Sequence, residues 1–401
     1  MRLTRAGDTG LGALLAVLLL SLNVASVSAR LGFLHKPKQV KEYDHWRYIE
    51  MARGERGRAE LRHEPPYCFR LAVPWLAGRL QRLGLPENAA FFSITNAVLF
   101  GFLLVLWLHL RDLGFALPLR VTGLLLVGLT QGAVRWSEYQ YWMTDPAGLF
   151  LVALAFFLIE RRRMLPLALL SVLAAFVRET YVLVYPYLFL HLLRLSLNKE
   201  GPARAAGSAL LRTGAVALLP AAILVAVRRL VAANRPYSFV AGIVDSMSFR
   251  WEHVLDSQLY VVTLGAFGVL LPLALLFPAR LADLGRRHFD RALFLASVYA
   301  TLTISNNNER PLAYALPALV PAALWCLRRF LAETRLPAAE VLALVVALQA
   351  LFWTNQRFAE AGISIYQPVN WTTTIAMLLA WAAAQLALRL RRPATAPAAP
   401  A

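Results

Sequence analysis

Apolar stretches alternate with short polar connections along almost the whole chain. A helix of about 20 apolar residues is long enough to cross the hydrocarbon core of a membrane, and most of these stretches come close to that length. The pattern therefore predicts an all-α, polytopic transmembrane helical bundle of about 12 spans, with 11–13 as the range. After a first apolar stretch near the N-terminus, the predicted spans are 89–110, 116–136, 146–160, 164–178, 180–195, 213–232, 257–278, 291–306, 311–328, 337–354 and 371–390.

The first apolar stretch, from Leu11 to Val27, has two interpretations. Arg5 precedes it and the small residues Ser28 and Ala29 follow it, as in a cleaved signal peptide. The alternative is an uncleaved first span, which the alternation of basic connections along the rest of the chain favours.

Basic residues outnumber acidic ones, with 41 Lys and Arg against 23 Asp and Glu. They lie in short clusters between apolar stretches and not on one soluble face, which argues against a nucleic-acid partner and matches the basic cytoplasmic loops of membrane proteins. Arg228 and Arg229, near a predicted outer end, and the basic first loop are the exceptions. With the N-terminus inside, the connections on the inner side contain Arg111, Arg120, Arg161, Arg162, Arg163, Arg194, Lys199, Arg204, Arg212, Arg280, Arg286, Arg287, Arg291, Arg328, Arg329, Arg335, Arg389, Arg391 and Arg392.

Composition agrees with a membrane location, because 59% of the residues are hydrophobic and only 16% are charged. Soluble domains are about 45–50% apolar and about 25% charged. We therefore expect a multi-pass protein of the cell (inner or plasma) membrane with both termini in the cytoplasm. Residues 1–392 would form one integral membrane domain, with 31–88 as a long first outer loop, and 393–401 a disordered Pro/Ala-rich tail.

The first outer loop contains two predicted amphipathic helices that suit the membrane interface, one around Asp44 and one from Tyr67 to Leu83. Asp44 is a candidate general base or cation ligand, or else a solvated acid beside basic neighbours. Asp145, just before Pro146, borders an apolar span. Acids at such positions are costly and often functional, although this one also suits a helix start.

Three arginines have the same kind of alternative. Arg178, followed by Glu179, interrupts an apolar stretch, and either the two form a structural ion pair or Arg178 binds a phosphate. Arg310 lies at the predicted outer mouth of a span and Arg70 lies in the first outer loop; each either neutralises a phosphate leaving group or extends its side chain to the interface.

Taken together, these segments resemble the GT-C superfamily of membrane glycosyltransferases, which use polyprenyl-phosphate sugar donors. Asp44 occupies the place of the acid in that superfamily's first outer loop. The other matching segments are Tyr67 to Pro74 with Phe69-Arg70, Thr144-Asp145-Pro146, Phe176-Val177-Arg178-Glu179-Thr180, and Arg310-Pro311-Leu312-Ala313-Tyr314 with Pro317.

The resemblance implies a hexosyl- or pentosyltransferase whose active face is directed outward. Its partners would be a polyprenyl-phosphate sugar donor, the membrane lipid, and a lipid, glycan or protein acceptor. Asp44 and Asp145 would be catalytic, whereas the substrate and its phosphate would contact Arg70, Arg178, Glu179, Arg310 and Tyr314.

The chain also departs from the superfamily's pattern. The acid in the first loop is single, which leaves a divalent cation as a cofactor in doubt, and no large soluble domain follows the last predicted span. Two other classes would use similar residues: a transporter or flippase for a lipid-linked anionic substrate, and a polymerase or ligase of lipid-linked glycans. The polar residues cluster at outer span ends and not at mid-membrane, which favours the transferase over a transporter.

Overall fold

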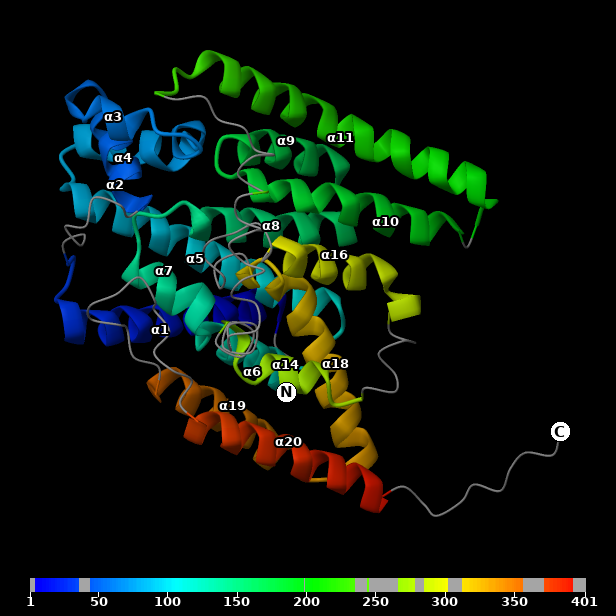
Figure 1. The fold of residues 1–401 in the computed structure, drawn as a ribbon. Coiled ribbons are helices and arrows are strands. Elements are labelled where there is room, and N and C mark those ends of the chain that lie inside the picture. Colours follow the sequence, from blue (N-terminus) through cyan, green and yellow to red (C-terminus); the bar gives the residue numbers. More distant parts are fainter. Residues whose placement is uncertain are drawn as a thin grey trace.

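The computed structural model describes residues 4–35, 44–197, 199–234, 244, 266–277, 285–301, 312–355 and 371–391. Within these ranges the regular elements are helices and no strand occurs, which confirms the predicted all-α class. Long helices run side by side through the bundle, while the short helices α2, α3 and α4 gather at one of its ends (Figure 1).

The first long helix, α1 (Arg5–Leu31), is built into this bundle. Thr4 caps its start, since its hydroxyl accepts a hydrogen bond from the Gly7 amide at 3.1 Å. The helix packs on α5 (Glu87–Asp112) and α6 (Leu117–Gly128). Near its other end, the amide nitrogen of Asn23 donates to the carbonyl oxygen of Gly128 at 2.9 Å.

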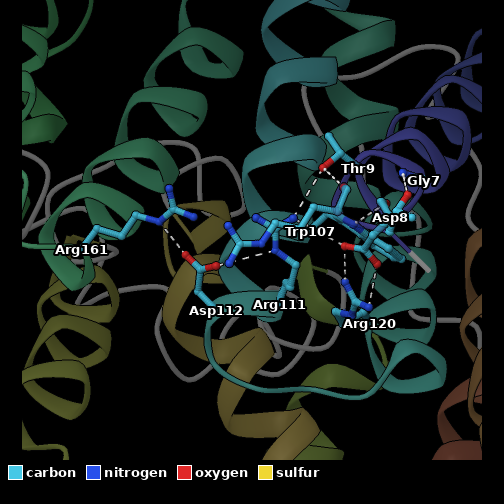
Figure 2. Close-up of polar contacts among 10 residues, drawn as sticks. Gly7, Asp8, Thr9, Trp107, Arg111, Asp112, Arg120 and Arg161 are labelled. Atoms are coloured by element: carbon cyan, nitrogen blue, oxygen red, sulfur yellow. Dashed lines mark hydrogen bonds and ion pairs between the residues drawn. The ribbon is translucent and has the colours of Figure 1, made fainter. Parts of the chain in front are cut away.

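A buried polar cluster joins these three helices at the predicted inner side (Figure 2). Both carboxylate oxygens of Asp8 pair with the Arg120 guanidinium at 2.8 Å, and the Trp107 indole donates to the Asp8 carbonyl oxygen at 3.1 Å. Asp112, at the end of α5, pairs with Arg161 at 2.6 Å. Part of the basic charge on the predicted inner side is therefore paired with acids, at a buried carboxylate for Arg120 and at an exposed one for Arg161.

The first outer loop folds into α2 (Asp44–Arg53), η1 (Gly54–Arg56), α3 (Ala59–Arg62), η2 (Tyr67–Phe69) and α4 (Ala72–Arg82). The helix predicted from Tyr67 to Leu83 is thus broken into η2 and α4. The backbone leaves the helical region at Arg70 (φ −96°, ψ 71°), and the amide of Ala72 donates to the carbonyl of Phe176 instead of to a helical neighbour. Tertiary contacts determine the break.

The predicted span 116–136 is also interrupted. Helix α6 ends at Gly128 and is followed by the π-helical turn η3 (Gln131–Arg135) and by α7 (Trp136–Tyr139). The axes of the segments Leu117–Gly128 and Gly132–Tyr139 differ by 47°. A π turn is a known cause of such a bend.

The middle of the chain contains α8 (Asp145–Glu160), α9 (Met164–Ala175), η4 (Glu179–Leu183), α10 (Val184–Leu197) and α11 (Pro202–Leu230). The predicted spans 146–160 and 180–195 agree closely with α8 and with η4 and α10. Helix α9 stops three residues before the predicted end, and α11 begins eleven residues before the predicted start at 213.

The described C-terminal helices are α14 (Leu270–Ala274), α16 (Phe289–Ala300), α18 (Leu316–Thr334), α19 (Ala338–Asn355) and α20 (Trp371–Arg391). Residues 257–265 and 278 of the predicted span 257–278 lie outside the described residues, and the remainder contains α14. Helix α18 lies later in the chain than its predicted span, 311–328. Helices α19 and α20 pack on each other along one edge of the bundle (Figure 1).

Four helices of the described chain are long and apolar enough to cross a membrane: Arg5–Ala29, Glu87–Asp112, Glu179–Leu197 and Pro202–Leu230. The bent pair around Gly128 brings the number to five if it counts as one span, and Met164–Ala175, Ala338–Thr354 and Ile375–Leu390 are shorter apolar helices. A membrane protein is supported by these helices, and the count of about 12 spans stays a prediction.

Candidate functional site

Breaks and ends of helices, far apart in sequence, meet at the end of the bundle that contains α2 and α4. Asp44 and Asp145 are the first residues of α2 and α8, and Arg70 lies between η2 and α4. Arg178 directly precedes η4, Glu179 is its first residue, and Tyr314 lies just before α18. Six of the seven predicted site residues are therefore described, whereas Arg310 lies outside the described residues.

Arg70 is the centre of this polar network. Its Nε donates to Glu179 Oε2 at 3.0 Å, its Nη2 pairs with Glu179 Oε1, and its Nη1 donates to the Tyr48 hydroxyl at 2.6 Å. Only 7% of Arg70 is exposed. Burial disfavours the cation, but the Glu179 carboxylate and the Tyr48 hydroxyl outweigh burial and raise the pKa of Arg70 well above its ordinary value, so that it stays charged.

A chain of hydrogen bonds leads from Arg70 to the second acid. The Tyr48 hydroxyl, fully buried, accepts a bond from Thr144 Oγ1 at 3.4 Å, and Thr144 accepts one from Arg178 Nη1 at 3.3 Å. The same Nη1 is 2.6 Å from Asp145 Oδ2. Arg70 and Arg178 thus each hold one carboxylate and are joined through two hydroxyl groups.

Asp44 joins the network through an aromatic pair. Its Oδ1 accepts a hydrogen bond from the Tyr67 hydroxyl at 2.8 Å, and the rings of Tyr67 and Tyr48 meet edge to face at 5.9 Å. Burial and then the negative charge of Asp44 raise the pKa of Tyr67 above its ordinary value, so that the phenol remains protonated and donates. The guanidinium of Arg70 lies 5.4 Å from the centre of the same ring.

Tyr314, from the C-terminal part of the chain, lies close to Arg178 and Asp145 of the network. It is buried, and its hydroxyl lies against Gly148 in α8: a Cβ atom at residue 148 would be only 2.5 Å from Tyr314 Oη. Real Cβ atoms do not approach other atoms so closely. The glycine therefore makes the room in which the tyrosine hydroxyl sits.

Three arginines surround a small cavity beside this network. Arg70, Arg178 and Glu179 line it from the loops, and Arg228 lines it from α11; the cavity has a volume of about 10 Å³, room for about one water molecule. Arg228 also lies over the Phe69 ring, 5.9 Å from its centre. Arg228 was an exception to the alternation of basic connections along the sequence. In the structure it lines the same cavity as the charged residues Arg70, Arg178 and Glu179.

Sequence reasoning missed Tyr48, Thr144 and Arg228 as members of the site. For Arg228 a signal existed, since it is a basic residue on the side where the alternation predicts none. Tyr48 and Thr144 carry no comparable signal, because each is an ordinary neutral side chain whose partners are distant in sequence.

The acids of the site are engaged by donors of the protein itself. No group of three or more His, Cys, Asp or Glu among them is arranged to hold a metal ion. One oxygen of Asp44 accepts from Tyr67, and Asp145 and Glu179 each pair with an arginine. The carboxylates of Asp44, Asp145 and Glu179 therefore each accept a hydrogen bond or ion pair from a side chain of the protein.

No protein-family model, curated protein or solved structure matches this chain at a significant level. The GT-C resemblance thus rests on short segments of this sequence alone.

Proposed function

We propose that this protein is an integral membrane glycosyltransferase that transfers a sugar from a polyprenyl-phosphate donor to a lipid, glycan or protein acceptor at the outer face. The observation that carries the proposal is the meeting of Asp44, Asp145, Arg70 and Arg178 in one network. Arg228 lines the cavity beside this network, and the five residues come from five separate segments. Buried charges are costly, and a shared charged substrate accounts for this concentration.

The donor phosphate would bind in the cavity between Arg70, Arg178 and Arg228. Planar guanidinium groups suit phosphate oxygens because they donate two parallel hydrogen bonds. Helix α11, which contributes Arg228, exposes Leu218, Leu219 and Leu230 on its outer surface. A prenyl chain lying along this apolar helix would therefore bring its phosphate directly to the cavity.

Asp44 would be the general base. In the reaction, the acceptor hydroxyl oxygen forms a bond to the anomeric carbon while the bond from that carbon to the donor phosphate oxygen breaks. The phosphate leaves with the electron pair and the hydroxyl proton goes to Asp44. The arginines would stabilise the negative charge that grows on the phosphate, and Asp145 would hold Arg178 in position.

A cavity of about 10 Å³ is too small for a sugar phosphate, so the donor must widen it on binding. The first outer loop and the end of α11 are joined across this region, since the amide of Asn234 donates to the His63 carbonyl at 2.9 Å. We expect opening to break this contact and separate α11 from η2. Substrate-induced rearrangement of such loops is common in enzymes.

The proposal is tested by incubating the purified full-length protein in detergent with a panel of polyprenyl-phosphate sugars and measuring release of polyprenyl phosphate. Asp44→Asn should lower turnover by about 10²–10⁴-fold and leave donor binding largely intact. Glu55→Gln, an exposed acid of the same loop, is the matched control and should be neutral. Normal turnover in folded Asp44→Asn protein would exclude Asp44 as the base.

The phosphate site has its own pair of variants on α11. Arg228→Gln should weaken donor binding and lower turnover, because the phosphate carries charge in both the ground and the transition state. Arg229→Gln removes an equally exposed neighbouring charge that does not line the cavity, and should be neutral. A transporter or flippase would bind the lipid-linked substrate but release no polyprenyl phosphate from any donor.

A further inference from the structure

Glu138, in α7, is a buried acid outside the network around Arg70. Only 2% of it is exposed, and α7 packs against α1, α5 and the π turn η3. Its Oε2 accepts a hydrogen bond from the Asn96 amide nitrogen at 3.3 Å. Within the described part of the chain, its Oε1 has no hydrogen-bond partner and no basic side chain pairs with either oxygen. Glu138 therefore differs from Asp145 and Glu179, each of which holds an arginine.

Glu138 follows the predicted span 116–136 by two residues, yet its carboxyl group lies at the depth of a membrane span. Helix α5 is one of the four helices long and apolar enough to cross a membrane. Asn96 lies nine residues after the first residue of this helix, Glu87, which at 1.5 Å per residue is roughly 14 Å along its axis. A charged acid is costly at such a depth, and an acid found there is a candidate for function.

The charged groups of η3 and of the outer end of α5 have partners other than Glu138. The Arg135 guanidinium, in η3, donates to the Trp353 carbonyl oxygen and lies 4.8 Å from the centre of that residue's ring. At the start of α5, Glu87 pairs with Arg53 at 2.7 Å. The other titratable or charged residues of α5 are at its opposite end: His109, Arg111 and Asp112. Of the side chains described on these two elements, no charged one pairs with Glu138.

Helix α1 and the residues after it present apolar and aromatic groups to α7. Val27 packs on Trp136 and Tyr139. The His35 ring stacks on Tyr139 with 6.1 Å between ring centres, and its Nε2 lies 3.0 Å from the Tyr139 carbonyl oxygen. The charged residues of α1 are Arg5, Asp8 and Arg30, and Arg30 is the one nearest to Val27 in the sequence. Water around a charged Glu138 would thus be replaced by apolar groups.

Such surroundings favour the neutral acid over the carboxylate. An unpaired charge is far more costly to transfer from water into an apolar environment than a neutral group, and a carboxylate takes up a proton instead. The neutral form keeps the hydrogen bond from Asn96, because its carbonyl oxygen is still an acceptor. Ca²⁺ and Mg²⁺ take about six or more oxygen ligands, whereas a proton needs one. A proton is therefore the cation that suits this single carboxyl group.

The segment that begins at Glu138 leads directly to the network around Arg70. Every residue from Glu138 to Asp145 is buried. Thr95 Oγ1, next to Asn96 on α5, donates to the Tyr141 carbonyl oxygen at 2.8 Å within this segment. The π turn and the bend of 47° lie just before it, and π turns occur frequently at functional sites. Movement of α7 away from α5 would therefore pull on the residues that hold Asp145.

We propose that Glu138 is a proton-binding site at the bend between α6 and α7. The carboxyl group holds the proton while α7 is packed against α5. When α7 moves away, the O–H bond breaks, water takes the proton, and the carboxylate is hydrated. This inference does not depend on glycosyl transfer, because it rests on the burial and the contacts of Glu138.

Infrared spectroscopy of the purified full-length protein in detergent at neutral pH tests the proton directly, by comparison with Glu138→Gln. An ordinary glutamate is ionised at this pH, and the carbonyl stretch of a neutral acid is separate from the carboxylate and amide bands. We expect the difference spectrum to contain the band of one neutral acid and no carboxylate bands. Carboxylate bands in the difference spectrum would overturn the proposal.

Asn96→Leu provides a second variant, which keeps the test decisive if Glu138→Gln does not fold. It removes the amide that donates to Glu138, so the carbonyl stretch of the neutral acid should move to higher frequency. Neutral-acid bands that are the same as in wild type would contradict the assignment of the proton to Glu138.

Hydrogen exchange of residues 136–143 tests the link between the proton and the movement of α7. In wild type, raising the pH favours the open form, and protection should fall by up to about tenfold per pH unit between about pH 5 and pH 7. Glu138→Gln has no proton to release and should show no such fall once the chemical exchange rate is corrected for. The same pH dependence in both proteins would overturn the link.

Glu160→Gln is the matched control for thermal unfolding, because Glu160 pairs with Arg291 at 2.6 Å. At neutral pH, Glu138→Gln should raise the unfolding midpoint, since the unfolded state no longer gains by ionising. Glu160→Gln should lower the midpoint, since Arg291 loses its partner. A midpoint lowered in both variants would mean that Glu138 is a paired carboxylate, and the proposal would be wrong.

Discussion

Replacing Glu179 by glutamine is predicted to move stability and anion affinity in opposite directions. The Glu179 carboxylate makes two hydrogen bonds to the Arg70 guanidinium. Glutamine has nearly the same size but no charge, and it can accept only one of these two bonds. The variant would leave Arg70 charged and buried without a carboxylate. Its hydrogen bond to the Tyr48 hydroxyl would remain.

The magnitude follows from the exposure of the two side chains. Removing one partner of a fully buried ion pair costs about 3–5 kcal/mol, whereas a fully exposed pair contributes at most about 1 kcal/mol. The Arg70 side chain is 9% exposed and that of Glu179 is 30% exposed. The pair lies between the two limits, and we expect Glu179→Gln to lower the free energy of unfolding by about 2 kcal/mol.

Affinity for polyprenyl phosphate should rise in the same variant. If the phosphate binds Arg70, it competes with the Glu179 carboxylate for the guanidinium, and glutamine removes this competitor. Unfolding by a denaturing detergent, followed by circular dichroism, gives the stability, and thermophoresis gives the affinity. Glu55→Gln serves as the control in both measurements.

The two measurements together distinguish a phosphate ligand from a purely structural arginine. Lower stability with unchanged or weaker phosphate binding would mean that Arg70 only fastens the first outer loop to η4. A loss of stability below about 0.5 kcal/mol is within the usual range for surface substitutions. Such a result would mean that the Arg70–Glu179 ion pair is not buried.

Two further predictions concern other parts of the chain. Asp8→Asn should lower the free energy of unfolding by about 3 kcal/mol, because it leaves Arg120 charged and buried; Arg120→Met in the same chain should recover part of the loss, and additive losses in the double variant would contradict the pairing. Glu50 is buried, which disfavours its charge, but hydrogen bonds from the backbone and side chain of Arg58 and the charge of Arg53 outweigh burial and lower its pKa below the ordinary 4.5. Its contribution to stability should be complete above pH 4.5 and decline as the pH falls below that value; hydrogen exchange of α2 should show this decline in wild type and not in Glu50→Gln.

The parts of the fold that the sequence predicts well are those in which one helix meets lipid or apolar neighbours along its whole length. The span at 89–110 agrees with α5 to within two residues at each end. A helix surrounded by apolar groups along its whole length needs a continuous apolar run, and that run is visible in the sequence. The bend after Gly128 could not be predicted in this way. Arg135, in the π turn there, donates to the carbonyl oxygen of Trp353, more than 200 residues later. The local hydropathy around Gly128 cannot predict a contact with so distant a residue.

In the candidate site, too, residues with a local sequence signal were predicted and those that depend on distant segments were not. The cost of charge beside an apolar span pointed to Asp145 and Arg178, and the structure brings these two together. The break at Arg70 went unpredicted, since it depends on Glu179 and on the carbonyl of Phe176 in distant segments. The catalytic roles of Asp44 and Asp145 remain predictions for the assays above.

The pairing of Asp8 with Arg120 also bears on how the protein is made. Asp8 lies in the first turn of α1, and its partner follows 112 residues later in the chain. At a synthesis rate of about 5–20 residues per second, the carboxylate emerges roughly 6–22 s before that arginine. During this interval α1 cannot complete its packing against α6, and Asp8 lacks the arginine with which it pairs. Formation of the first helix and its final packing in the bundle are therefore separate events, and the arrival of Arg120 sets the earliest time of the second.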